Sequence, residues 1–462
     1  MKKSEMKGCK IQNDKLMGIL SRKDAICFCR VLLLAATSSA LAGNQIIPGN
    51  GVCDPHVTIH GDRAYLFATD DAGGMTDWWV WSSDDLVNWR HESTVKPQEV
   101  FTKWQPRSVE PTNHACWATF GAFKSGHVFW YVSAAPMAVL MADSPAGQWK
   151  DPIGHSLIPE GLPGSAYDQD ILIDDDGTAY MVYGCYDYYI VRLNADMISL
   201  AETPRHVQFD RKFGPYGFGR TDDKPSLHKR NGIYYLSWCS FYATSTNAYG
   251  PFAYKGSVLA SETTAPDFLP VDVDLWYDRH GNFFTWHNQW FYTCNDYSQP
   301  NRKGRESVIN YVHFRDDGTM APVRLDRVGV GEYDASHNIE AEDYFAAGGG
   351  AEVRERPAGG FEMRNLHEGS YLVYPKARNL PANASVTFIL SSQTGGGKIE
   401  VREKQPDGKL LGSCAIPSTQ GRWDVYQSVA CGLQNHAGTN DICLTFKGDG
   451  AELVRVDRFR FR

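Results

Sequence analysis

The sequence predicts an all-β protein in which a five-bladed β-propeller is followed by a β-sandwich. From Gly51 to about Arg327 there is almost no helical periodicity, and short runs rich in Tyr, Val, Phe and Trp alternate with Gly, Asp and Asn turns. One phrase, a tight turn followed by an aromatic strand, recurs five times in that stretch. A second set of alternating strands fills the C-terminal part of the chain.

The recurring phrase sets the number of blades. It reads GDRAYLF, SGHVFWY, DGTAYMV, NGIYYLS and HNQWFYT, and its register aromatics are Tyr65, Phe129, Tyr180, Tyr235 and Phe291. A period of about 50 residues with several short strands in each unit is typical of propeller blades. Five units at similar spacing favour five blades, over residues 46–327, rather than the coincidental hairpins of a β-sandwich.

Residues 1–42 are expected to be a signal peptide. They hold eight Lys/Arg against three Asp/Glu, then the apolar run Val31–Ala36, and they end in Ala40-Leu41-Ala42. We therefore expect a secreted or periplasmic protein. No other apolar run approaches the roughly 18 residues of a membrane span, so none is expected.

Charge and composition narrow the class of partner. Without the leader the chain has 38 basic and 51 acidic side chains, and such a surface repels the phosphate backbones of nucleic acids. An aromatic content of 13% offers stacking surfaces for sugar rings. Eight cysteines remain, none in a CxxC pair, and export permits disulfides whose pairing the sequence leaves open.

The C-terminal part predicts an independent β-sandwich of the jelly-roll kind. A Gly-, Asp- and Ser-rich stretch at 328–338 suits a linker. Residues 339–462 then give the alternating strands SYLVYPKA, SVTFILSS, KIEVREK and DICLTFKG, which match a compact sandwich of about 100 residues.

Both predicted domains resemble known families. Nearly all of 46–327 resembles glycoside hydrolase family 43, through DPHVTIHGDRAYLF, SSDDLVNW, CWA, ILIDDDGTAYMVYG, KPSLHKRNGIYYLSW and ATSTNAYGPFAYKG in the family's order. The C-terminal domain is similar to carbohydrate-binding module family 6, through IEAEDY, GSYLVY, TGGGKIEVRE and VDRFRF. The resemblance implies propellers that remove arabinose, xylose or, in some members, galactose from plant polysaccharides with inversion, without a catalytic cofactor.

Inversion requires one carboxylate that deprotonates water and a second, protonated, that donates to the leaving oxygen, about 6.5–9.5 Å away. The resemblance makes Asp54 the base, although an Asp that caps the Asp-Pro turn is the alternative. It makes Asp168 the third carboxylate, which orients the acid and raises its pKa by like-charge repulsion. Gln169 stands where the family has Pro, and Asp170 is a rival for Asp168.

The general acid is where the chain departs from the family. Asp223 stands two residues before Pro225, where the family has Glu, and its side chain is one methylene shorter. Three hypotheses follow: Asp223 is the acid, another carboxylate such as Glu110 has taken the task, or catalysis is lost or altered. Strand alternation predicts that Lys224 faces away from the pocket.

Three further residues of the first domain are candidates for substrate binding. His280 matches a family His that lines the axial channel, often beside a bound calcium, and an ordinary buried His is the alternative. Trp117 is either a sugar platform or a core residue. Arg305 is placed to hydrogen-bond a sugar hydroxyl.

For the second domain the resemblance implies a structural calcium on Glu340, Glu342 and Asp457, because hard oxygen clusters suit Ca²⁺; solvated surface carboxylates are the alternative. Trp423 stands where the module stacks a sugar. Asn365 replaces the partner aromatic and Arg455 replaces a ligand-binding Asn, so we expect weak or absent sugar binding there.

The sequence thus predicts an exported, exo-acting, inverting glycosidase that removes terminal α-L-arabinofuranosyl or β-D-xylosyl units, or galactosyl units, from oligo- or polysaccharides of plants. A glycan-binding propeller that has lost turnover is the alternative. Propellers that cleave sucrose and fructans are disfavoured because their Asn-Asp-Pro-Asn motif is absent; His56 follows Asp54-Pro55. The loops that line the pocket, and not the blade pattern, determine which sugar binds.

Overall fold

The structure is a computed structural model that describes residues 46–49, 51–110, 114–210, 224–259, 280–296, 305–324, 329–434 and 441–462. Nearly all regular structure in these residues is β. The exceptions are α1 (Pro97–Val100) and a 3₁₀ turn (Arg107–Val109). No helix in the described ranges is long and apolar enough to cross a membrane.

Five antiparallel sheets, each following the order of the chain, make up the N-terminal domain. The first has β1 (Val52–His60), β2 (Arg63–Asp70), β3 (Trp78–Ser83) and β4 (Arg90–Val95); the second has β5 (Trp117–Lys124), β6 (His127–Ser133) and β7 (Met137–Ala142). The third has β8 (Asp170–Ile173), β9 (Ala179–Cys185), β10 (Asp187–Arg192) and β11 (Arg205–His206). The fourth has β12 (Ser226–Arg230), β13 (Ile233–Trp238), β14 (Phe241–Ser245) and β15 (Ala253–Ser257), and the fifth has β16 (Gly281–Trp286), β17 (Gln289–Asp296) and β18 (Glu306–Tyr311).

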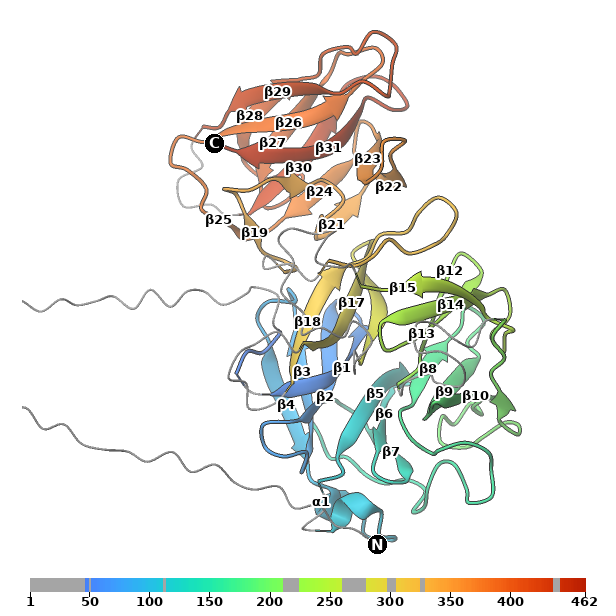
Figure 1. The fold of residues 1–462 in the computed structure, drawn as a ribbon. Helices are drawn as coiled ribbons and strands as arrows, with labels where there is room; N and C mark the ends of the chain where they lie inside the picture. Colours follow the sequence, from blue (N-terminus) through green and yellow to red (C-terminus); the bar gives the residue numbers. More distant parts are fainter. Residues whose placement is uncertain are drawn as a thin grey trace, which may run out of the picture. The chain divides into compact units, whose positions relative to one another are not determined.

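The sheets close into a ring. Their first strands β1, β5, β8, β12 and β16 are neighbours in that order, and β16 also contacts β1. Figure 1 shows the blades in this succession, from β1–β4 through β5–β7, β8–β10 and β12–β15 to β17 and β18. The start of the chain joins the last blade, because Ile46 N donates to Ser307 O in β18 at 2.8 Å. The five-bladed propeller predicted from the repeat is confirmed.

The repeated phrase marks the first hairpin of each blade. The five register aromatics all lie on the second strand of their blade, on β2, β6, β9, β13 and β17. The turns before these strands contain left-handed residues such as Gly61, Gly126, Gly177 and Gly232. Two-residue hairpin turns require such backbone conformations, and glycine adopts them without a steric penalty.

The C-terminal domain is the predicted β-sandwich. One sheet has the order β22 (Glu352–Glu355), β23 (Phe361–Leu366), β31 (Val454–Phe461), β26 (Ser385–Ser391) and β29 (Gln427–Gly432), with β20 (Ile339–Glu340) paired to β31. The other has β21 (Ala346–Gly348), β24 (Tyr371–Tyr374), β30 (Ile442–Lys447), β27 (Lys398–Glu403) and β28 (Leu410–Ala415). A short parallel pair, β19 (Tyr333–Asp334) with β25 (Ala377–Arg378), completes the described strands.

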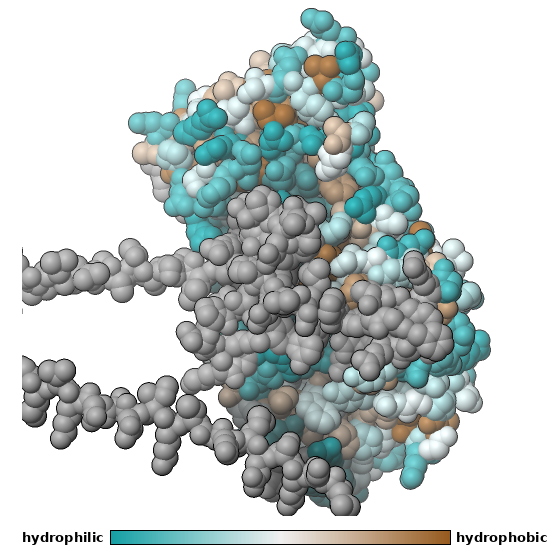
Figure 2. Space-filling model, in the orientation of Figure 1, coloured by the Kyte–Doolittle hydropathy of each residue, from teal (hydrophilic) through white to brown (hydrophobic). Residues whose placement is uncertain are grey.

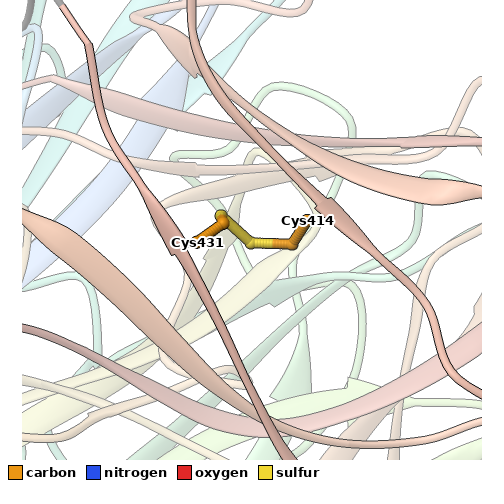
Figure 3. The surroundings of a disulfide bond; sticks show 2 residues. All are labelled: Cys414 and Cys431. Carbon is orange, nitrogen blue, oxygen red and sulfur yellow. A yellow bond between two sulfur atoms is a disulfide. The ribbon is translucent and has the colours of Figure 1, made fainter.

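A disulfide between Cys414 and Cys431 joins the two sheets of the sandwich through their edge strands β28 and β29 (Figure 3). The sequence left this pairing open. In the propeller, Cys53, Cys239 and Cys294 are free and buried, whereas the free Cys185 at the end of β9 is partly exposed.

The surface is mostly polar. Large exposed hydrophobic side chains in the described part of the chain are Ile173, Tyr186 and Leu410. On the face shown in Figure 2, hydrophobic residues are scattered among hydrophilic ones.

Candidate active site

The predicted site lies at one end of the ring, where the inner strands begin. The corresponding places, within two residues of the start of β1, β5, β8, β12 and β16, are occupied by Asp54, Trp117, Asp168, Lys224 and His280. Three of them have left-handed backbones, with φ of 51° at Asp54, 47° at Asp168 and 62° at Lys224. Such conformations disfavour side chains other than glycine, by about 1–3 kcal/mol each, and they cluster at functional sites.

Asp54 is at the centre of a hydrogen-bond network and is 3% exposed. Its Oδ1 is 2.6 Å from His280 Nδ1, and it accepts from Asn295 Nδ2 at 2.8 Å and from Arg305 Nη1 at 2.9 Å. Lys224 Nζ donates to the same oxygen. Oδ2 accepts from Arg305 Nη2 at 3.2 Å. The network gathers side chains from the first, fourth and fifth blades around one carboxylate.

The charges of this network keep Asp54 ionised. Burial raises the pKa of Asp54, but the cations of Arg305 and Lys224 and the hydrogen bonds from Lys224 and Asn295 outweigh it. The pKa therefore lies below its ordinary value of 3.8. Asp54 is ready to accept a proton at neutral pH, although the same cations weaken its affinity for that proton.

Arg305 is itself fixed by a second carboxylate. Its backbone N and its Nε donate to Asp71 Oδ2 at 2.7 and 3.0 Å, and its Nη2 donates to Asp71 Oδ1 at 3.1 Å. Burial raises the pKa of Asp71, but its hydrogen bonds and ion pair with Arg305 lower it overall. The guanidinium thus bridges two carboxylates, and its contact with a sugar hydroxyl stays a prediction.

The expected orientation of Lys224 is wrong. Its side chain faces Asp54 and the residue is 8% exposed. Alternation along an extended strand does not apply to this residue, because it lies two residues before β12 with a left-handed backbone. The lysine beside the predicted acid is therefore a partner of the predicted base.

Asp168 is 1% exposed, and its backbone N donates to Ser133 Oγ at 3.0 Å. His280 Nε2 is 3.8 Å from Asp168 Oδ2, so one imidazole lies between Asp168 and Asp54. The rival Asp170 has a structural role, because its Oδ2 accepts from Leu227 N of the next blade at 3.0 Å. These contacts favour Asp168 as the carboxylate of the site.

Gln169, which stands where the family has Pro, makes three side-chain hydrogen bonds to the second blade. Its Nε2 donates to Tyr131 O at 2.9 Å and to Ala118 O at 3.2 Å, and its Oε1 accepts from Ser133 Oγ at 3.2 Å. These bonds join the third inner strand to the second blade and fix the backbone beside Asp168.

These residues line a cavity of about 30 Å³. Its lining includes Asp54, Asp168, Lys224 and His280, together with the residues that follow them on the inner strands. This volume is the size of one water molecule.

The remaining candidates of the first domain are placed as follows. Asp223 lies outside the described residues. Glu110, the other candidate acid, is exposed. Trp117 is half-buried, with Tyr167 in edge contact at 5.4 Å and the Arg107 guanidinium 5.9 Å from its ring centre.

The predicted calcium ligands of the second domain are Glu340, Glu342 and Asp457, and the structure shows their surroundings. No three His, Cys, Asp or Glu side chains within the described ranges are arranged to hold a metal ion. Asp457 Oδ1 and Oδ2 each lie 2.5 Å from an arginine, Arg356 and Arg458 respectively. Burial, followed by the charge of Asp343, raises the pKa of Glu342 and raises that of Glu340 to about 7. These two carboxylates are close to other acids, but Asp457 is paired with cations, and calcium stays a prediction here and near His280.

The predicted sugar platform of the second domain is covered. The Arg455 guanidinium is 4.2 Å from the ring centre of Trp423, and Glu452 Oε1 accepts from Arg455 Nε at 3.0 Å. Asn365 donates from Nδ2 to Gly350 O at 2.7 Å. A guanidinium held against the indole competes with a sugar ring for that face.

Sequence reasoning missed two residues of the site, Asn295 and Asp71. Asn295 is 241 residues from Asp54 and lies on β17, the second strand of its blade. Asp71 follows the end of β2. Strands β2 and β17 run antiparallel to the inner strands, so they end at the end of the ring where β1 begins. Polar residues at the ends of second strands are therefore the signal that could have found both.

Comparisons with known proteins agree with this architecture. Residues 43–320 match the model of glycosyl hydrolases family 43, and residues 340–462 match that of carbohydrate binding module family 6. An arabinoxylan arabinofuranohydrolase of Paenibacillus polymyxa is 27% identical over 492 residues, which covers 90% of this chain and 75% of that protein. The enzyme of the same name from Bacillus subtilis is 26% identical over 499 residues, 92% of this chain and 94% of that protein.

Among solved structures, a family 43 arabinoxylan arabinofuranohydrolase from Bacillus subtilis in complex with cellotetraose has a TM-score of 0.51 and 23% identity, over 91% of this chain and 97% of that chain. This likeness concerns the fold. Because the model of the N-terminal domain matches more than half of the sequence, the chain belongs to glycosyl hydrolases family 43 and is a glycosidase acting on O-glycosyl bonds.

Proposed function

We propose that the protein is an exo-acting, inverting glycosidase that removes terminal α-L-arabinofuranosyl or β-D-xylosyl units from plant polysaccharides, with galactosyl units as a further candidate. The observation that carries the proposal is the buried carboxylate of Asp54, held ionised at the end of the ring axis with Asp168 on the other side of His280. The names of two relatives, both arabinoxylan arabinofuranohydrolases, support a substrate of the arabinoxylan class.

In the proposed reaction, Asp54 accepts a proton from a water molecule as the water oxygen forms a bond to the anomeric carbon. The bond between that carbon and the glycosidic oxygen breaks at the same time, and Asp223 donates its proton to the departing oxygen. Asp168 raises the pKa of the acid by its nearby charge. Attack from the face opposite the leaving group inverts the configuration.

Export is part of the proposal. The basic start, the apolar run Val31–Ala36 and the small residues before Gly43 support a cleaved leader, and a polymer of the plant cell wall can be reached only outside the cell. N-terminal sequencing of protein from the culture medium or periplasm tests this part, with Gly43 as the expected first residue.

The experiment for the activity is a panel of 4-nitrophenyl glycosides, followed by NMR of the anomer first released from the best substrate. We expect turnover of the α-L-arabinofuranoside or the β-D-xylopyranoside, and an initial product of inverted configuration. A first product with the substrate's configuration would contradict the mechanism.

A second candidate function is a glycan-binding propeller without turnover. The observation that favours it is the ion pair of Lys224 with Asp54, which lowers the proton affinity of the base. Retention on arabinoxylan in affinity electrophoresis, together with no turnover of any glycoside in the panel, would establish this function in place of hydrolysis.

A further inference from the structure

We propose that Lys224 is a positioning residue for hydrolysis: its ammonium holds Oδ1 of Asp54, so that Oδ2 is the oxygen that takes the proton from the attacking water. This inference rests on the proposed function. It assigns a role to a residue that lies in the site but is not one of its three expected carboxylates.

The two carboxylate oxygens of Asp54 have unequal numbers of hydrogen-bond donors. Oδ1 faces nitrogens of Lys224, His280, Asn295 and Arg305, whereas Oδ2 has one long bond, at 3.2 Å, from Arg305. A carboxylate has about four lone-pair positions in all. The four donors at Oδ1 occupy the lone pairs of that oxygen. Oδ2 keeps a lone pair that can accept a proton from the attacking water.

Lys224 and Asp54 form a buried ion pair between two blades of the ring. Its side chain is 6% exposed and that of Asp54 is 1% exposed, so the ion pair is shielded from solvent. Lys224 has φ of 62°, a conformation that lysine adopts at a cost, and this backbone turns the side chain out of the strand alternation and toward Asp54. The pair also connects the fourth blade to the first.

The charges that face Asp54 come from several elements. The cations are Lys224, before β12, and Arg305, before β18. The imidazole of His280 precedes β16. The neighbouring carboxyl groups are those of Asp71, after β2, and Asp168, before β8. Arg305 divides its guanidinium between Asp54 and Asp71. Lys224 Nζ donates to Oδ1 of Asp54 from the fourth blade.

The chain offers a matched control. Lys229 Nζ donates to Asp174 Oδ1 at 2.5 Å, and this pair also joins the fourth blade to another blade, at a distance from the site along β12. Replacing Lys229 removes an inter-blade ion pair without changing the surroundings of Asp54. It separates a loss of structural support from a change at the predicted base.

The test is the pH profile of kcat/KM on the best 4-nitrophenyl glycoside, from about pH 3 to about pH 9, for the full chain and for K224M, K224R and K229M. Loss of the ammonium raises the pKa of Asp54, so the acid limb of K224M moves to higher pH by at least about one unit. A displaced base also lowers kcat at least about tenfold. K224R restores the position of the limb, and K229M has the wild-type profile.

Each outcome decides the matter. An active wild type whose acid limb coincides with that of K224M overturns the role of Lys224 and leaves the proposed function standing. An equal shift in K229M also overturns it. Absence of turnover in the wild type overturns the proposed function, and the role of Lys224 in hydrolysis with it.

Discussion

His280 contacts the carboxylate of Asp54, with Nδ1 2.6 Å from Oδ1, and its other ring nitrogen is 3.8 Å from Asp168 Oδ2. One imidazole thus lies between two buried carboxyl groups and fixes the orientation of the predicted base.

Replacing His280 by Ala should lower kcat at least about tenfold, with a smaller change in KM, because Asp54 loses an orienting contact and gains an unshielded neighbour in Asp168. Initial rates over a range of substrate concentrations measure this. His127, whose Nδ1 is 2.9 Å from Asp143 on the surface, provides the control variant H127A. Unchanged kcat in H280A would show that the imidazole only fills space.

Replacing Asp54 by Asn should destabilise the protein by about 3 kcal/mol at neutral pH, because Lys224 is left buried without its anion. The pKa of Asp54 is lowered in the folded state, so its stabilisation is complete above the unfolded value of 3.8 and is lost as the pH falls through the lower folded value. The difference in thermal midpoint between D54N and wild type should therefore narrow in acid. A difference that stays constant with pH would contradict the ion pair.

Replacing Asp77 by Asn should stabilise the propeller at pH 7. Burial, followed by the charge of Asp70, raises the pKa of Asp77 from 3.8 to about 6, and its Oδ1 is buried without a hydrogen-bond partner. A raised pKa means that stability is lost as the pH rises from 3.8 through about 6, and Asn removes that loss.

After a discount for solvent screening at this half-buried carboxyl, we expect a gain of about 1 kcal/mol at pH 7 and none near pH 4. Denaturant unfolding at the two pH values measures the gain, and D449N, at an exposed turn, is the control. Equal stability of D77N and wild type at both pH values would refute the prediction.

Removing the disulfide between Cys414 and Cys431 should destabilise the β-sandwich by about 3 kcal/mol, because the bond closes a loop of 17 residues and joins two edge strands. Calorimetry of the C414S/C431S variant should show a lower midpoint for the sandwich and an unchanged one for the propeller. Addition of a reductant to the wild type should reproduce the shift. A wild type that is insensitive to reductant would indicate that the bond is not formed.

Replacing Trp423 by Ala should leave binding to arabinoxylan nearly unchanged, because the Arg455 guanidinium already covers the indole. Affinity electrophoresis of the full chain compares W423A with wild type and with R455A, which uncovers the ring. We expect stronger retention only for R455A. A loss of retention in W423A would show that a sugar displaces the arginine.

Local signals explain what the sequence predicted. The turn-plus-aromatic phrase is read within seven residues, and all five register aromatics from Tyr65 to Phe291 lie on corresponding strands. Five such hairpins of similar length bury their hydrophobic faces against one another, and this packing produces the ring of blades. The alternating strands of residues 339–462 predicted the sandwich for the same reason.

Long-range and backbone-dependent features could not be predicted. Asn295 and Arg305 reach Asp54 across 241 and 251 residues, so no local pattern connects them. The orientation of Lys224 depends on a left-handed φ, which the alternation rule assumes to be absent. The pairing of Cys414 with Cys431 depends on which two strands form the edges of the sandwich.

The most direct test of the account is kcat of D54N against wild type on the preferred 4-nitrophenyl glycoside, for D54N protein that still unfolds cooperatively. We expect kcat to fall about 10²–10⁴-fold, the usual contribution of a general base, with KM changed far less. A D54N variant as active as the wild type would contradict the assignment of Asp54 as the base.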